Sequence, residues 1–145
     1  MISENKYFGY SLLLTIILFI SIFSLFSMKT IIYREDINKV FSSYDSSKDK
    51  LYVNNVVVKN DSIIFIFKNI EKTSDGRNTG KTEINIKLFE NNKTKYIMLL
   101  RDFRYPKKYW VHLKESEIDK KGICIGEINT NQFDEIEKVT ENNRY

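Results

Sequence analysis

The chain has 145 residues, a formal net charge of +4 and 42% hydrophobic residues. This length leaves room for one domain of ordinary size. Because Cys124 is the only cysteine, an intramolecular disulfide is excluded. His112 is the only histidine, which excludes a metal site built from several histidines and leaves little material for a catalytic triad.

A long apolar segment lies near the N-terminus, after a short tail of residues 1–9. No charged residue occurs from Tyr10 to Met28. Nineteen helical residues rise roughly 28 Å, which is about the thickness of the hydrocarbon core of a bilayer. Residues 10–28 are therefore predicted to form a transmembrane anchor in contact with the lipid bilayer. The side chains expected to face lipid are Leu12, Leu13, Leu14, Ile16, Ile17, Leu18, Phe19, Ile20, Ile22, Phe23, Leu25 and Phe26.

Two interpretations of this segment compete, an uncleaved anchor and a removed secretory signal. The apolar core of a signal is usually shorter and ends in small residues before the cleavage site. This core is long and ends in "SLFSMK", where Ile22 and Ser24 form only a passable cleavage pair. We expect an uncleaved anchor, with cleavage after about residue 24–28 as the alternative.

The charges that flank the segment leave its orientation open. Lys6 precedes it, and Lys29, Arg34 and Lys39 come after it, so a count of positive residues places the long domain in the cytoplasm. A very short tail before a single span is instead typical of a signal anchor that exports the domain on its C-terminal side. We expect a single-pass protein of the cell membrane with its C-terminal domain outside the cytoplasm.

The next segment, residues 29–50, has the periodicity of an amphipathic helix. Tyr33, Ile37, Val40, Phe41 and Tyr44 form one apolar stripe at helical spacing. The polar turn "DSSKDK" at 45–50 ends the pattern. A juxtamembrane helix is predicted here, either separate from the anchor or continuous with it.

Residues 51–139 have the pattern of a β-rich domain, followed by a polar tail at 140–145. Two β-branched and aromatic runs joined by "KND" predict a hairpin, and four further runs predict strands. The predicted strands are 51–58, 62–69, 82–90, 94–101, 107–114 and 122–128, and a short closing helix is predicted at 129–139. This is an α+β fold: a transmembrane helix, a second helix, a five- to six-stranded antiparallel meander that forms a roll or a partly closed barrel, and a short C-terminal helix.

The stretch "DGRNTGKT" at 75–82 is similar to a phosphate-binding loop. Such a loop needs four residues between its first glycine and GKT, and a helix after it. Gly76 and Gly80 are separated by only three residues, and the following "EINIKLF" alternates like a strand. We therefore predict a loop between strands and no bound nucleotide.

Other reactive side chains do not form a recognisable constellation. His112 shares one strand face with Trp110 and is expected to be exposed or partly buried, and Cys124 is expected to be a packed thiol. The carboxylates of Glu115, Glu117 and Asp119 are expected to lie in a solvated loop. The sequence therefore predicts no catalytic residue, no metal and no cofactor, and the chain is not expected to be an enzyme.

Charge is distributed unevenly along the C-terminal half. Residues 93–114 contain seven basic residues and one acidic residue, a net charge of +6, whereas residues 115–145 have a net charge of −4. The basic strip is either an ordinary solvated sheet edge or a surface for anionic headgroups or an acidic partner. Nucleic acid is not expected, because an exported domain would rarely meet it. Candidate contacts are Arg101, Arg104, Lys107, Lys108, Tyr109 and Trp110.

These features favour a non-enzymatic binding module. Alanine is absent while Lys, Asn and Ile are abundant, a bias expected of an AT-rich, bacterial genome. We expect an accessory or regulatory partner of another envelope protein. One alternative is an immunity protein that blocks a toxin acting at the envelope. Another is a small-ligand sensor whose pocket is lined by Phe65, Phe67, Tyr96 and Met98. The sequence leaves the oligomeric state open.

Overall fold

The computed structural model describes residues 2–58, 61–73, 82–90 and 92–134. One helix, α1 (Ile2–Ser42), includes both the predicted span and the predicted juxtamembrane helix. The chain divides into two compact units, Met1–Ile32 and Tyr33–Tyr145, and α1 begins in the first and ends in the second. The two predicted helices are therefore one continuous helix.

The first unit is a helix with exposed apolar side chains. The stretch Phe8–Ser42 has a mean hydropathy of 2.4 in its most apolar window, and none of that window is buried. Two hydroxyls in the span donate to carbonyls one turn earlier, Thr15 to Ser11 at 2.9 Å and Ser21 to Ile17 at 2.8 Å. They are thereby satisfied without water. This helix is long and apolar enough to cross a membrane, as a signal sequence also is.

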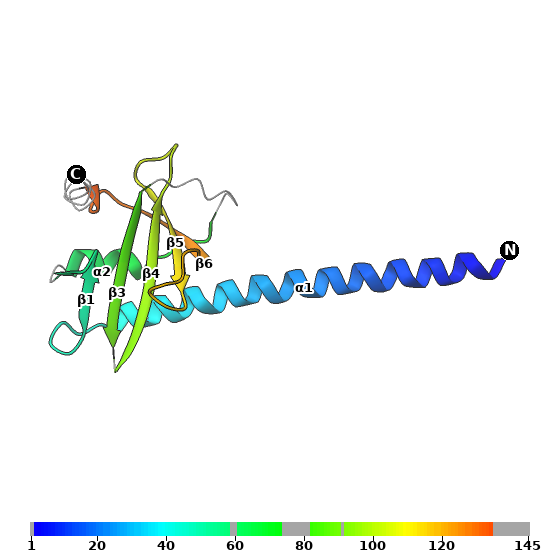
Figure 1. Ribbon diagram of the computed structural model, residues 1–145, viewed down its shortest axis with the longest axis horizontal. Helices are drawn as coiled ribbons and strands as arrows, with labels where there is room; N and C mark the ends of the chain where they lie inside the picture. Colours follow the sequence, from blue (N-terminus) through cyan, green and yellow to red (C-terminus); the bar gives the residue numbers. More distant parts are fainter. Residues whose placement is uncertain (1, 59–60, 74–81, 91, 135–145) are drawn as a thin grey trace. The chain divides into compact units, whose positions relative to one another are not determined.

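The second unit is built on one antiparallel sheet of six strands in the order β2-β1-β3-β4-β5-β6 (Figure 1). The strands are β1 (Lys50–Val53), β2 (Val56–Val58), β3 (Glu83–Glu90), β4 (Lys93–Arg101), β5 (Lys108–Lys114) and β6 (Ile123–Asn129). The last four are consecutive in a meander, close to their predicted bounds. The α+β class and the antiparallel sheet are thus confirmed, and the sheet is not closed.

The predicted strand 51–58 is two strands joined by a tight turn. Asn54 and Asn55 have φ angles of +48° and +68°, and Val53 pairs with Val56 across them. A two-residue hairpin loop favours positive φ at both positions, which asparagine tolerates better than most residues. The prediction of a single strand at 51–58 was wrong because it did not recognise Asn54 and Asn55 as a turn.

The predicted strand 62–69 is also wrong, because its core is the helix α2 (Asp61–Phe67). Ile63, Ile64 and Phe67 are buried, whereas Phe65 is 65% exposed. Positions i, i+1 and i+4 lie on one side of a helix. A short run that is apolar at every position has no periodicity of its own, so its tertiary surroundings decide between strand and helix.

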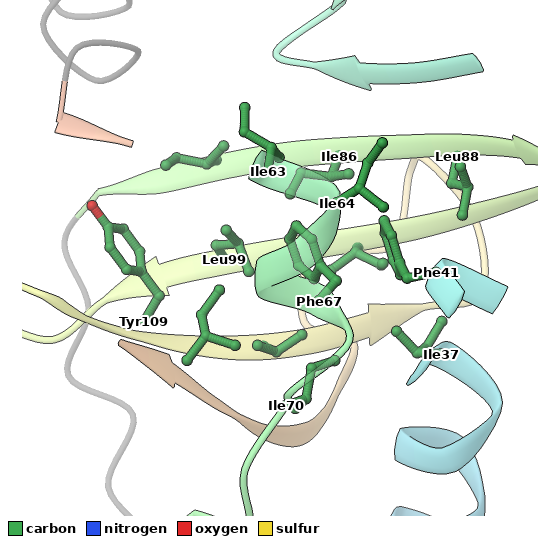
Figure 2. Packing of buried hydrophobic residues seen from close by; sticks show 14 of the residues in the cluster. Ile37, Phe41, Ile63, Ile64, Phe67, Ile70, Ile86, Leu88, Leu99 and Tyr109 are labelled. Atoms are coloured by element: carbon green, nitrogen blue, oxygen red, sulfur yellow. The ribbon is translucent and has the colours of Figure 1, made fainter. Parts of the chain in front are cut away.

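The core lies between one face of the sheet and the two helical segments. Figure 2 shows Ile37 and Phe41 of α1 and Phe67 of α2 gathered over Leu88 and Leu99 of the sheet. The rings of Phe41 and Phe67 stack with centroids 4.5 Å apart. The end of α1 is thus an integral part of the core, as its apolar stripe predicts.

Residues 135–139 of the closing helix predicted at 129–139 lie outside the described residues. Within the described part, Asn129 ends β6 and Phe133 is buried against Tyr109, with ring centroids 5.4 Å apart. The β6 edge is joined by Glu71, which exchanges two backbone hydrogen bonds of 2.9 Å with Glu127. The outer edge of the sheet at β6 is therefore paired at this position.

Candidate binding surfaces

The structure divides the predicted basic strip into a buried and an exposed part. Tyr109 lies in the core with no exposed surface, and Trp110 is 1% exposed on the opposite, outer face of the sheet. Lys108 is also buried on the outer face, whereas Arg104 and Lys107 are exposed. Direct contact with a partner is thus open to Arg104 and Lys107 but not to Lys108, Tyr109 and Trp110 in this structure.

The buried lysine Lys108 has partners within the domain. Its ammonium lies 2.8 Å from a carboxylate oxygen of Glu127 on β6. It also lies 4.6 Å from the centroid of the Trp110 ring, within the range of a cation–π contact. Charge pairing and the aromatic face compensate for its burial, so Lys108 belongs to the scaffold of the outer face.

Arg101, at the end of β4, is half-buried and fixes the start of the next loop. Its guanidinium lies 2.7 Å from a carboxylate oxygen of Asp134, and its Nε donates to the backbone carbonyl of Pro106 at 2.7 Å. Both partners of these bonds belong to the domain, so Arg101 holds the loop between β4 and β5 in place.

The loop between β4 and β5 presents aromatic and basic side chains to solvent. We call residues 103–107, "FRYPK", the exposed loop (Figure 1). Phe103 is 69% exposed and Tyr105 is 56% exposed, and the two alternate with Arg104, Pro106 and Lys107. Exposed aromatic side chains beside cations are a common composition of protein-binding surfaces.

Asp102 determines the conformation of the exposed loop. Its Oδ1 accepts hydrogen bonds from the backbone N–H groups of Arg104 at 2.7 Å and Tyr105 at 3.1 Å, and its Oδ2 accepts one from Trp110 Nε1 at 3.1 Å. Burial alone would raise the pKa of Asp102, but these three donors and the Lys108 charge together lower it. An ionised carboxylate therefore organises the loop before any partner arrives, which reduces the ordering cost of binding.

The second candidate surface is a groove on the face of the sheet opposite the core, which we call the outer groove. Its volume is about 630 Å³, within the range of small-molecule sites. The Asn54–Asn55 turn and the loop after β5 border it, and β3, β4 and the end of β5 line it. Its lining includes Lys87, Tyr96, Lys114, Glu117, Ile118 and Asp119.

The two reactive side chains singled out from the sequence lie opposite each other on neighbouring strands. His112 on β5 pairs with Cys124 on β6. His112 is only 4% exposed, which is more buried than predicted, and its neighbours on the same face of β5, Trp110 and Lys114, are also buried. Burial raises the pKa of the half-buried Cys124, and the thiol is therefore not activated.

The carboxylates of the loop after β5 have structural roles. Asp119 accepts backbone N–H bonds from Lys121 at 3.1 Å and Gly122 at 3.4 Å, and these bonds lower the pKa of Asp119. Glu117 lies 2.5 Å from Lys87, and Glu115 is exposed. Among the described residues, no group of three or more His, Cys, Asp or Glu side chains is arranged to hold a metal ion.

The four residues expected to line an apolar pocket are not brought together. Phe67 lies in the core and Phe65 is exposed on α2, while Tyr96 and Met98 alternate with the core residues Ile97 and Leu99 and so lie on the outer face. The prediction of that pocket is therefore wrong.

The remaining sequence signal is the apparent phosphate loop. Residues 75–81 of this motif lie outside the described residues, and strand β3 begins at Glu83, directly after Thr82. Sequence reasoning missed the outer groove because two separate turns and residues from three strands form it. Comparison of the chain with protein-family models, with curated protein sequences and with solved structures found no match.

Proposed function

We propose that the chain is a membrane-anchored, non-enzymatic binding module that acts outside the cytoplasm as an accessory or regulatory partner of another bacterial envelope protein. The proposal is supported by the exposed apolar stretch of α1 and by the burial of the end of the same helix in the core of the domain. A domain held at a membrane in this way meets membrane proteins at high effective concentration.

The exposed loop is the contact surface that we assign to this function. The observation that carries the assignment is that Asp102 holds Phe103, Arg104 and Tyr105 in a defined conformation while both aromatic rings remain exposed. Two large rings that are more than half exposed add little apolar burial to the isolated domain. Next to Arg104 and Lys107 they suit a partner surface with an apolar pocket rimmed by acidic residues.

Site-specific photocrosslinking in cells tests the binding function. A photoreactive residue replaces Phe103 in the full-length chain, and the matched control replaces Ile118, which is 87% exposed on another loop. A discrete adduct with an envelope protein is expected from position 103 and not from position 118. Identical adduct patterns at both positions, or no adduct at position 103, would contradict the assignment.

A charge reversal at the same loop tests its specificity. Arg104→Glu combined with Lys107→Glu is expected to remove the adduct at position 103 while leaving the unfolding temperature of the full chain unchanged, since both side chains are exposed. A toxin as the crosslinked protein would identify the immunity alternative, and a membrane enzyme or regulator would identify the accessory role.

The location is tested separately. Alkaline phosphatase fused after Tyr145 is expected to be active in a bacterial host, and the chain is expected to stay in the membrane fraction after alkaline extraction. A phosphatase-inactive fusion beside an active cytoplasmic reporter would place the domain in the cytoplasm. Release of an N-terminally shortened chain would show that α1 contains a cleaved signal.

A further inference from the structure

The outer groove contains a buried lysine that forms no ion pair with a carboxylate among the described residues. Lys114, at the end of β5, is 9% exposed and lines the groove. Within the described part of the chain its ammonium makes one hydrogen bond, a donation to the backbone carbonyl of Glu117 at 3.2 Å. An ammonium has three N–H donors, so two donors remain for another group.

The neighbouring lysine, Lys87, differs from Lys114 because it has a carboxylate partner. Lys87, Tyr96 and Lys114 lie in one row across β3, β4 and β5 on the outer face. The side-chain carboxylate of Glu117 is 2.5 Å from Lys87 and neutralises it, so only the main chain of Glu117 serves Lys114. The other acid of this loop that lines the groove, Asp119, accepts hydrogen bonds from backbone N–H groups of its own loop. The charge of Lys114 acts on Asp119 and contributes to its lowered pKa, but the two side chains form no ion pair.

We propose that the outer groove is a binding site for a small organic molecule with a single carboxylate, which Lys114 holds. An ammonium that faces a groove with two N–H donors unused and no ion pair is a favourable place for a carboxylate, because hydrogen bonds to a charged group are stronger than neutral ones. This inference does not rest on the exposed loop or on its partner.

The charges of the groove select the class of anion. Three lysines and three carboxylates line it, namely Lys87, Lys114, Lys120, Glu83, Glu117 and Asp119. Lys114 and Lys120 both line the groove without an ion pair among the described residues, but only Lys114 is buried. A monoanion matches this one buried ammonium, whereas a phosphate dianion would be repelled by Glu117 and Asp119. The amide side chains of Asn54, Asn55 and Asn85, also in the lining, provide further polar contacts for the body of the ligand.

The test uses the full chain in nonionic detergent micelles, with sodium acetate as the probe. Backbone amide shifts of residues 114–120 are followed by NMR, with sodium chloride and methylammonium chloride as controls at equal ionic strength and inorganic phosphate as the dianion. Acetate is expected to give saturable shifts that neither control reproduces. Equal shifts with chloride and acetate, or tighter binding of phosphate than of acetate, would overturn the proposal.

A pair of variants assigns the binding to Lys114. Lys114→Met is expected to weaken acetate binding about tenfold or more, because it removes a charged donor. The matched control, Lys107→Met, removes an exposed lysine outside the groove and is expected to leave binding unchanged. Unchanged binding by a folded Lys114→Met variant would overturn the assignment. If that variant does not fold, the wild-type comparison of acetate with methylammonium and phosphate decides the question.

Discussion

Lys108 and Glu127 form an ion pair of 2.8 Å between β5 and β6, with each side chain only 8% exposed. Removal of one partner leaves the other as an uncompensated buried charge. Lys108→Met is therefore expected to lower the free energy of unfolding by about 3–5 kcal/mol. The measurement is urea denaturation of the full chain in micelles.

The double variant Lys108→Met with Glu127→Met separates the value of the pair from the cost of an orphaned charge. It is expected to be more stable than Lys108→Met alone, since two apolar side chains of similar length replace two charges. Additive losses would show that the two residues act independently. Because Lys108 belongs to this buried pair, a charge reversal at Lys108 would destabilise the fold and is unsuitable for testing partner binding.

The assignment of 61–67 as a helix predicts opposite effects for two phenylalanines in the same run. Phe67 is fully buried against Phe41, and Phe65 is 65% exposed. Phe67→Ala is expected to lower the free energy of unfolding by about 3–5 kcal/mol. Phe65→Ala is expected to stay within about 0.5 kcal/mol of wild type. Equal losses would contradict the arrangement of α2, because in a strand residues 65 and 67 lie on the same face.

The same run shows what the sequence could and could not predict. The strands β3 to β6 were predictable because alternation such as Ile84, Ile86 and Leu88 places one side chain in two on the core, and all three are buried. The run "SIIFIF" contained no such alternation. Its helical conformation depends on tertiary packing, in which Phe67 stacks on Phe41. Alternation also placed Tyr109 on the face opposite Trp110.

The outer face could not be predicted because burial there depends on side-chain contacts that the alternation of a strand does not show. Trp110 is buried on that face, where it donates to Asp102 and lies beneath the ammonium of Lys108. The outer groove likewise joins the turn at Asn54 with Lys114, which lies far away in the sequence. Local patterns carry no information about such contacts, which is why the basic strip was predicted as one surface.

Gly126 allows the segment after α2 to approach β6. A Cβ atom at this position would lie 2.4 Å from the backbone oxygen of Glu71 and 2.4 Å from Cγ2 of Ile70. Gly126→Ala is therefore expected to displace the Glu71–Glu127 bridge and to cost about 1–3 kcal/mol of unfolding free energy. Gly9→Ala is the matched control, because a Cβ atom there meets nothing within 4 Å.

Hydrogen exchange locates the effect of that substitution. The amides of Glu71 and Glu127 donate the two bonds of the bridge, so both are expected to exchange faster in Gly126→Ala than in Gly9→Ala. Unchanged protection at both amides together with unchanged stability would show that the added Cβ atom is accommodated with the bridge intact.

The buried imidazole of His112 makes stability depend on pH. Neither ring nitrogen has a hydrogen-bond partner among the described residues, and burial lowers the pKa of His112 from its usual 6.5, an effect that the nearby backbone of Lys121 and Gly122 only partly offsets. The unfolded chain therefore binds a proton at a higher pH than the folded chain. The stabilisation is present above about pH 6.5 and is lost as the pH falls towards the folded pKa.

Substitution of the imidazole isolates this contribution. His112→Phe retains a ring of similar size and removes the titrating group, and neither ring nitrogen has a partner among the described residues to lose. From about pH 7.5 to about pH 5, the unfolding free energy of wild type is expected to fall more steeply than that of His112→Phe, by at most about 1.4 kcal/mol per pH unit. Parallel curves would show that His112 titrates alike in both states. A shallower fall for wild type would mean that the folded protein stabilises the charged imidazolium, and the lowered pKa would then be wrong in sign.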